Sequence, residues 1–262
     1  MLTAIENLTP QGEIFDTHAH YNDIAFAQDS ATLFDQLKLF NVIGGITCGC
    51  DIKSTRDSIT LVKRTKNWYA AAGFHPENLP QSLENIDGII PFLSEEKVVA
   101  VGEIGLDYYW NLFPKEHQIN CFVRQIEIAK EHNLPAIVHD RESHGDVLSI
   151  LKEHKPRGVV HCFSGSAQTA SEIIKLGMYI GIGGVVTFKN ARKTTEVVEA
   201  IPLERILLET DAPYLAPEPY RGKQNHSGMI IFVAQKIAQI KGTDTAAVLK
   251  ICNQNAFDLF DF

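Results

Sequence analysis

The chain is best read outward from Ile14-Phe15-Asp16-Thr17-His18-Ala19-His20, a short apolar run that ends in acidic and imidazole side chains. If this run is a strand, alternate residues share one face, so Asp16, His18 and His20 point the same way. Two imidazoles at one strand end can bind a metal ion, and Asp16 could fix the tautomer of a histidine ring from the far side. The alternative is two ordinary histidines, because H-x-H alone is a weak signal.

Short apolar runs rich in β-branched residues alternate along the chain with longer amphipathic runs, which predicts a parallel sheet covered by helices. The predicted strands are Ile14–Ala19, Val42–Cys48, Trp68–Phe74, Val98–Glu103, Ala136–His139, Gly158–His161, Tyr179–Ile182 and Ile206–Glu209. Helices are predicted over Lys115–His132, Ala167–Leu176, Thr194–Ala200, Ile230–Lys241 and Thr245–Phe260, with Ser166 or Ser164 as the N-cap of the second.

Eight strands fit either an open doubly wound sheet or a closed barrel, and 262 residues is an ordinary length for an α/β barrel. No G-x-G-x-x-G follows the first strand, which disfavours a dinucleotide-binding sheet. No low-complexity linker or change of composition divides the chain. We therefore predict a single domain over residues 1–262, with residues 1–12 as an N-terminal extension.

The net charge of −8 argues against a protein that coats a nucleic-acid backbone, because such binding is driven by positive charge. It does not exclude a nuclease that takes a strand end into a metal site, where the ions supply the positive field. Five cysteines without a C-x-x-C pair, and no secretory signal, predict reduced thiols in the cytoplasm. No apolar run approaches the length of a membrane span, and a monomer is the default expectation.

Histidines and acids follow the predicted strands at their carboxyl ends. In an α/β barrel this rim is the active-site face, where residues distant in sequence converge. Four histidines and two carboxylates together would be electrostatically awkward without a cation: His18, His20, Glu103, His139, His161 and Asp211. Such ligands suit zinc, manganese, nickel or iron and also admit magnesium. Six exceed the needs of one tetrahedral ion, which favours two ions roughly 3.5–4 Å apart.

In combination these motifs resemble the TatD-like metal-dependent hydrolases, which are metal-dependent deoxyribonucleases. The resemblance covers nearly the whole chain and rests on D-T-H-x-H (16–20), G-x-H-P (73–76), G-E-I-G-L-D (102–107), H-x-R (139–141), H-C-F-S-G (161–165) and E-T-D-A-P (209–213). It implies a TIM (β/α)8 barrel of the amidohydrolase type and cleavage of DNA, including 3′-to-5′ trimming. One ion would be held by His18, His20 and Asp211, and a second by His139 and His161, with Glu103 between them.

One departure from the family pattern follows Asn225, where the family often continues Glu-Pro and this chain has His226-Ser227. A Glu-Pro pair would start the next helix with an acid and a fixed φ. The sequence therefore does not determine how the chain enters the last helices, although all six predicted ligands are intact.

The expected reaction is phosphodiester hydrolysis of single-stranded DNA or 3′ ends by a metal-bound hydroxide, with two divalent ions drawn from Mg, Mn, Zn or Ni. Asp211 is the expected general base, or a ligand only. Glu209, on the same face as Asp211, is expected to support the ligands, or to form a plain buried pair with Asp211, and Asp16 has a similar status. His75, Arg141 and Arg221 are candidate substrate contacts, since a guanidinium suits phosphate; the alternatives are packing, a surface ion pair and a solvated loop. Tyr108, Tyr109 and Trp110 could stack bases or pack their loop.

Two other functions fit the same ligands. An amidohydrolase-type enzyme could act on a small ester, amide or phosphoester, and the acidic net charge favours this reading slightly. A metal-bearing binding protein without turnover is the third, against which the intact Asp211 argues, because a purely structural site needs no open coordination position.

Overall fold

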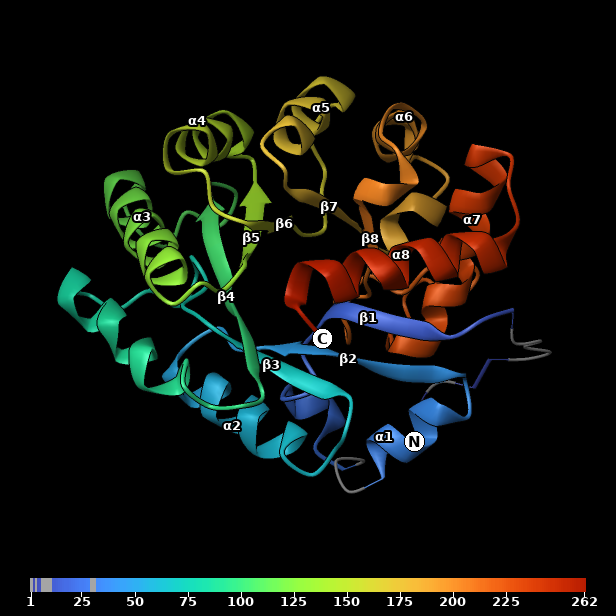
Figure 1. Cartoon of the computed structure of the whole chain (residues 1–262), viewed down its shortest axis with the longest axis horizontal. Coiled ribbons are helices and arrows are strands. Elements are labelled where there is room, and N and C mark those ends of the chain that lie inside the picture. Colours follow the sequence, from blue (N-terminus) through green and yellow to red (C-terminus); the bar gives the residue numbers. More distant parts are fainter. Residues whose placement is uncertain (1, 3, 6–10, 29–31) are drawn as a thin grey trace.

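Eight parallel strands form one sheet whose order follows the sequence from β1 to β8, and Figure 1 shows them at the centre of a ring of helices. This computed structural model describes residues 2, 4–5, 11–28 and 32–262, so most of the predicted extension 1–12 lies outside the described residues. The strands are β1 Ile14–Ala19, β2 Val42–Cys48, β3 Trp68–Ala72, β4 Val98–Asp107, β5 Ala136–Arg141, β6 Gly158–Val160, β7 Tyr179–Ile182 and β8 Ile206–Leu208. The predicted TIM barrel is confirmed.

The helices surround the strands in the order α1 Leu33–Lys38, α2 Ile52–Val62, α3 Lys115–Glu131, α4 His144–His154, α5 Ala167–Lys175, α6 Arg192–Ala200, α7 Ile230–Lys241 and α8 Thr245–Phe260. Short 3-10 turns are η1 Ile24–Phe26, η2 Leu83–Phe92, η3 Gly184–Thr187, η4 Leu203–Arg205 and η5 Ser227–Met229. The predicted N-cap Ser166 accepts the Thr169 N–H at the start of α5. Among the described helices, none is both long and apolar enough to cross a membrane.

Several strand ends differ from the prediction by a few residues. β6 ends before His161 and β8 before Glu209, although the N–H groups of these two residues still bond to the carbonyls of Val138 and Ile182 on the neighbouring strands. β4 runs past Glu103 to Asp107, because it continues to pair with β5 there. The extra length brings Asp107 to the same rim as the predicted ligands.

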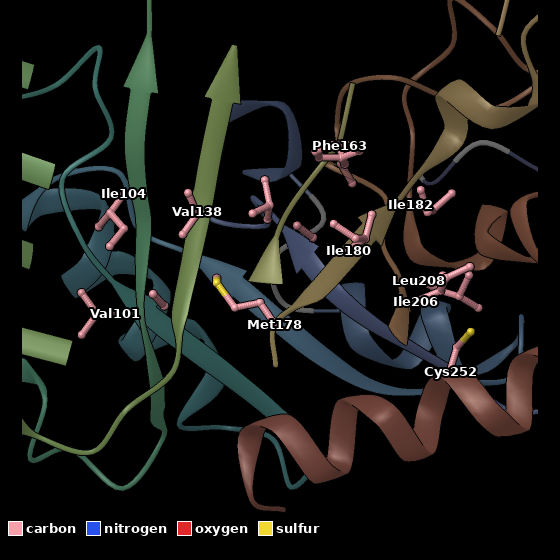
Figure 2. Close-up of a cluster of buried hydrophobic side chains, with 14 of the residues drawn as sticks. Val101, Ile104, Val138, Phe163, Met178, Ile180, Ile182, Ile206, Leu208 and Cys252 are labelled. Carbon is pink, nitrogen blue, oxygen red and sulfur yellow. The ribbon is translucent and has the colours of Figure 1, made fainter. Parts of the chain in front are cut away.

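The core has two layers. The inner layer fills the barrel with side chains from seven strands and from α8: Phe15, Ile46, Cys48, Ala71, Ala100, Ile137, Val159, Leu207, Ala256, Leu259 and Phe260. Helix α8 therefore covers one end of the barrel, and Figure 1 shows it lying across the strands. Figure 2 shows part of the outer layer, in which Ile180, Ile206 and Leu208 lie together and Cys252 of α8 points toward them.

The barrel closes between β1 and β8 through few backbone contacts. An isolated bridge joins Ala19 to Ala212, and the His20 N–H donates to the Ala212 carbonyl at 2.7 Å. The hydroxyl of Thr17 donates to the Leu208 carbonyl at 3.0 Å. The carboxylate of Asp16 accepts both the N–H and the hydroxyl of Thr210. Side chains thus supply much of the pairing at this seam.

Gly105 occupies a position at the rim where no larger residue fits. It lies on β4 with a φ of +147°, and a Cβ there would overlap the His139 carbonyl. We expect Gly105→Ala to lower the free energy of unfolding by roughly 2 kcal/mol or more, because strain and overlap add. Gly145 on α4 is the matched control, since nothing lies within 4 Å of a Cβ built there. Denaturant titration of both metal-free variants measures the difference; equal stability would contradict this account.

Candidate metal centre

Four donor atoms from three strand ends meet at the carboxyl rim of the barrel. The Nε2 atoms of His18 and His20 lie 3.1 Å apart. Each is 3.3–3.7 Å from Oε2 of Glu103 and from Oδ1 of Asp211. Donors that bind a tetrahedral ion at about 2.0–2.1 Å lie roughly 3.3 Å from one another. His18, His20 and Asp211 therefore form a group whose spacing fits one divalent ion, with Glu103 beside the two imidazoles.

The other oxygen of Glu103 faces a second group of donors. Its Oε1 is 2.7 Å from Nε2 of His161 and 2.9 Å from Nδ1 of His139, and those two nitrogens lie 3.4 Å apart. Burial raises the pKa of Glu103, but the charges of His161 and His75 outweigh this and hold it well below the ordinary value. An ionised carboxylate with one oxygen toward each group has the chemistry of a bridging ligand.

Asp107 fixes the second histidine pair and had no predicted role. Its Oδ2 is 3.0 Å from Nε2 of His139, and its Oδ1 accepts the N–H groups of Tyr109 and Trp110. Burial lowers the pKa of His139, yet hydrogen bonds with Asp107 and Glu103 raise it to about 9. The signal in the sequence is the final acid of G-E-I-G-L-D, four residues beyond Glu103.

The alternation of a regular strand predicts that Asp16 bonds a histidine ring. Asp16 lies near the first group of donors but does not bond the His18 ring. Its Oδ1 accepts the backbone N–H of His18 at 3.1 Å, while the ring of His18 stacks on His161 at 3.9 Å. The β1–β2 register shifts between Asp16 and Ala19, which breaks the simple alternation. Burial raises the pKa of Asp16 to about 6. Asp16 thus holds the backbone of β1 rather than a ring tautomer.

Glu209 is buried beside the second group. Its Oε1 accepts the Cys162 N–H and lies 3.9 Å from Nδ1 of His161. Within the described residues, Glu209 Oε2 and His161 Nδ1 have no hydrogen-bond partner. Burial raises the pKa of Glu209 to about 8, so this acid is neutral at pH 7 in the metal-free protein. A neutral Glu209 adds no repulsion to the nearby Asp211.

His226 and Ser227, which replace the Glu-Pro of the family pattern, lie in a buried hydrogen-bonded cluster. Ser227 is buried, donates its hydroxyl to Oδ2 of Asp16 at 2.6 Å and donates its N–H to the Tyr21 hydroxyl at 2.8 Å. His226 is also buried and accepts the Gly228 N–H at 3.2 Å, which caps η5. The His-Ser pair therefore starts this turn and also secures the acid that holds β1.

A cleft of about 770 Å³ opens over both groups of donors. His75 lies in its wall with Nε2 at 3.4 Å from Glu103, and Arg141 lies there with its guanidinium 4.1 Å above the Tyr109 ring. Tyr108 instead packs in its loop, bonded to Asp146. Arg221 does not line this cleft. Its guanidinium stacks on Phe188, 4.4 Å from the ring centre.

Comparisons with known proteins place the chain among metal-dependent hydrolases. A family model described as TatD-related DNase matches residues 15–261. The uncharacterised metal-dependent hydrolase YabD of Bacillus subtilis is 40% identical over 94% of this chain and 98% of its own. The 3′-5′ ssDNA/RNA exonuclease TatD of Escherichia fergusonii is 30% identical over 94% and 98%. The crystal structure of YJJV, a TatD homolog from Escherichia coli K12, matches with a TM-score of 0.86 and 32% identity over 95% of this chain and 98% of that one.

Metal binding should release protons. His139 has a pKa of about 9 in the metal-free protein and is protonated at pH 7, whereas a metal ligand must be deprotonated. We expect at least one proton released per ion at this group, and an affinity that falls about tenfold per pH unit for each proton displaced as the pH is lowered. Titration calorimetry in buffers of different ionisation enthalpy measures the release. Metal content unchanged between pH 8 and about pH 5 would contradict this ligand set.

Ser227→Ala should weaken the first group without touching a ligand. Removing the hydroxyl leaves Asp16 short of one hydrogen bond, and we expect a loss of about 1–3 kcal/mol in unfolding free energy. Metal affinity should fall by about tenfold or more, the usual cost of losing a group behind the ligands. Ser58→Ala is the control, since Ser58 is buried on α2 and its hydroxyl has no partner among the described residues. Metal titration of both variants decides; equal affinities would count against the role of Ser227.

Proposed function

Because the chain belongs to the TatD-related DNase family of metal-dependent hydrolases, we propose that it is a divalent-metal-dependent nuclease that cleaves DNA phosphodiester bonds from the 3′ end. The observation that carries the proposal is Glu103, which turns one carboxylate oxygen toward each of two donor groups. Two-ion sites of this kind suit the in-line displacement at phosphorus. The relative from Escherichia fergusonii, named as a 3′-5′ exonuclease, supports the same direction.

The proposed ion sites follow from the two groups of donors. His18, His20 and Asp211 would hold one ion, His139 and His161 a second, and Glu103 would lie between them. When bound, divalent ions would polarise the phosphoryl oxygen and make a neighbouring water more acidic. Mg, Mn, Zn and Ni all remain candidates, since imidazole and carboxylate donors admit each of them.

Asp211 is the proposed general base. Its side chain is 19% exposed and lies in the cleft wall. Burial raises its pKa, but the hydrogen bond and charge of His20 outweigh this and hold the pKa below the ordinary value. Asp211 is therefore ionised at neutral pH and able to accept the proton of the attacking water. Glu209 would support His161 from behind.

Three residues are proposed to contact the substrate. His75 and Arg141 lie in the cleft wall, and Arg141 offers a planar guanidinium to a phosphate. Arg221 is proposed to meet the strand farther from the reacting bond, because it is exposed outside the cleft. We also propose that one monomeric barrel over residues 1–262 is the catalytic unit. The cytoplasmic location inferred from the cysteines stays a prediction.

A nuclease assay tests the proposal. Single-stranded DNA labelled at the 3′ or the 5′ end is incubated with the metal-loaded protein and with Asp211→Asn. We expect metal-dependent release of mononucleotides from the 3′ end and a loss of about 100-fold or more in the variant, the usual contribution of a general base. Asp258→Asn, an exposed acid on α8 away from the cleft, is the matched control and should retain full activity.

The alternative function has its own outcome in this assay. Turnover of small ester, amide or phosphoester substrates, with no cleavage of DNA under Mg²⁺, Mn²⁺ or Zn²⁺, would replace the nuclease by an amidohydrolase-type enzyme. Metal binding without turnover of either class would indicate a binding protein.

A further inference from the structure

Two large aromatic side chains stand exposed in the wall of the cleft. Trp110 is 54% exposed and Tyr214 is 54% exposed, and both line the same cleft as the metal-binding groups. Trp110 lies in the loop after β4, and Tyr214 lies in the loop after β8. Exposed aromatic rings inside a concave site are a common mark of ligand binding, because burying them removes apolar surface from water.

The topology sets the two rings on opposite sides of the cleft. β4 and β8 are four strands apart in a closed order of eight, so their carboxyl ends face each other across the barrel axis. Figure 1 shows these two strands on opposite sides of the barrel. Glu103 and Asp211 precede the two rings on the same strand ends, so the donor groups lie between the rings.

The backbone that carries each ring is held by an acid at the rim of the barrel. Asp107 contacts His139 and also accepts the backbone N–H of Trp110 at 2.9 Å. The guanidinium of Arg141 lies 5.6 Å from the Trp110 ring centre. The N–H of Tyr214 donates to the Asp211 carbonyl at 2.9 Å. The loops that carry the two rings are therefore anchored beside the donor groups, so a planar group stacked on either ring would lie close to the reacting phosphate.

The hydroxyl of Tyr214 donates to Asp23 at 3.0 Å, which turns the polar end of the ring away from any stacked partner. The chain carries a net charge of −8, so attraction to a phosphate backbone is weak and another source of affinity is needed. Base stacking on an aromatic ring supplies such affinity without positive charge, and every base has a π-face. Bases inside a duplex are already stacked and paired, and they do not offer that face.

We propose that Trp110 and Tyr214 form an aromatic clamp that stacks the bases on either side of the reacting phosphate. The inference rests on the proposed nuclease function. It adds that the bases, rather than the backbone, hold the strand in the cleft.

The test compares wild type with Trp110→Ala and Tyr214→Ala on two oligonucleotides of equal length, one normal and one abasic at the two positions that flank the 3′-terminal linkage. Each variant should raise KM for the normal oligonucleotide by about tenfold, as loss of one base–aromatic stack does, with a smaller change in kcat. On the abasic oligonucleotide the same variants should change KM by less than about twofold. Trp110→Phe and Tyr214→Phe should recover most of the loss, because the ring remains.

Tyr179→Ala is the matched control, since this partly buried ring lies on β7 under Arg205 and does not line the cleft. Equal losses on normal and abasic oligonucleotides would overturn the clamp, as would duplex cleaved as readily as single strand. If wild type cleaves no DNA, the proposed function fails, and fluorescence anisotropy of the labelled oligonucleotides then judges the clamp. Binding that needs the bases and weakens in Trp110→Ala supports it; binding that ignores the bases overturns it.

Discussion

Closure of the barrel between β1 and β8 is the constraint on which the rest of the site depends. The backbone contributes an isolated bridge and a few hydrogen bonds there, and the side chains of Asp16, Thr17 and Thr210 add to the pairing. The same seam brings the histidines of β1 to Asp211, because the Asp211 N–H donates to the His18 carbonyl. Closing the barrel and assembling the first group of donors are therefore one event.

Glu103 connects this seam to the other side of the rim. One of its oxygens faces the seam group and the other faces His139 and His161. Several acids and imidazoles are thereby packed in a space with little water, which is costly unless opposite charges compensate. The pKa values shift in opposite directions as a result. Burial lowers the pKa of His18 to about 4, while hydrogen bonds with Asp107 and Glu103 raise the pKa of His139 to about 9. Divalent cations would reduce this cost.

Much of the fold and of the site was predictable from the sequence, because strand ends in a parallel barrel share one rim. The apolar runs predicted all eight strands, and the polar residues after most of them predicted which side chains converge at one rim. What the sequence did not reveal depends on local irregularity and on tertiary contacts. A register shift in β1 turns Asp16 away from the His18 ring, and the extra length of β4 delivers Asp107. Tyr214 lies in no motif that indicates a function. Its proposed role follows from the position of its loop after β8, across the cleft from the loop after β4 that carries Trp110.

The closure between β1 and β8 also determines when, during synthesis, the first group of donors can be completed. A nascent chain displays His18 and His20 early, yet Asp211 and the Ser227 that secures Asp16 come near the end. Glu103, His139 and His161 can meet before that point, but the first donor set stays incomplete until most of the polypeptide has left the ribosome. Because chains emerge from the N-terminus, the unfinished chain lacks part of the donor set proposed for the first ion. In the proposed nuclease, activity would therefore begin only after the barrel has closed.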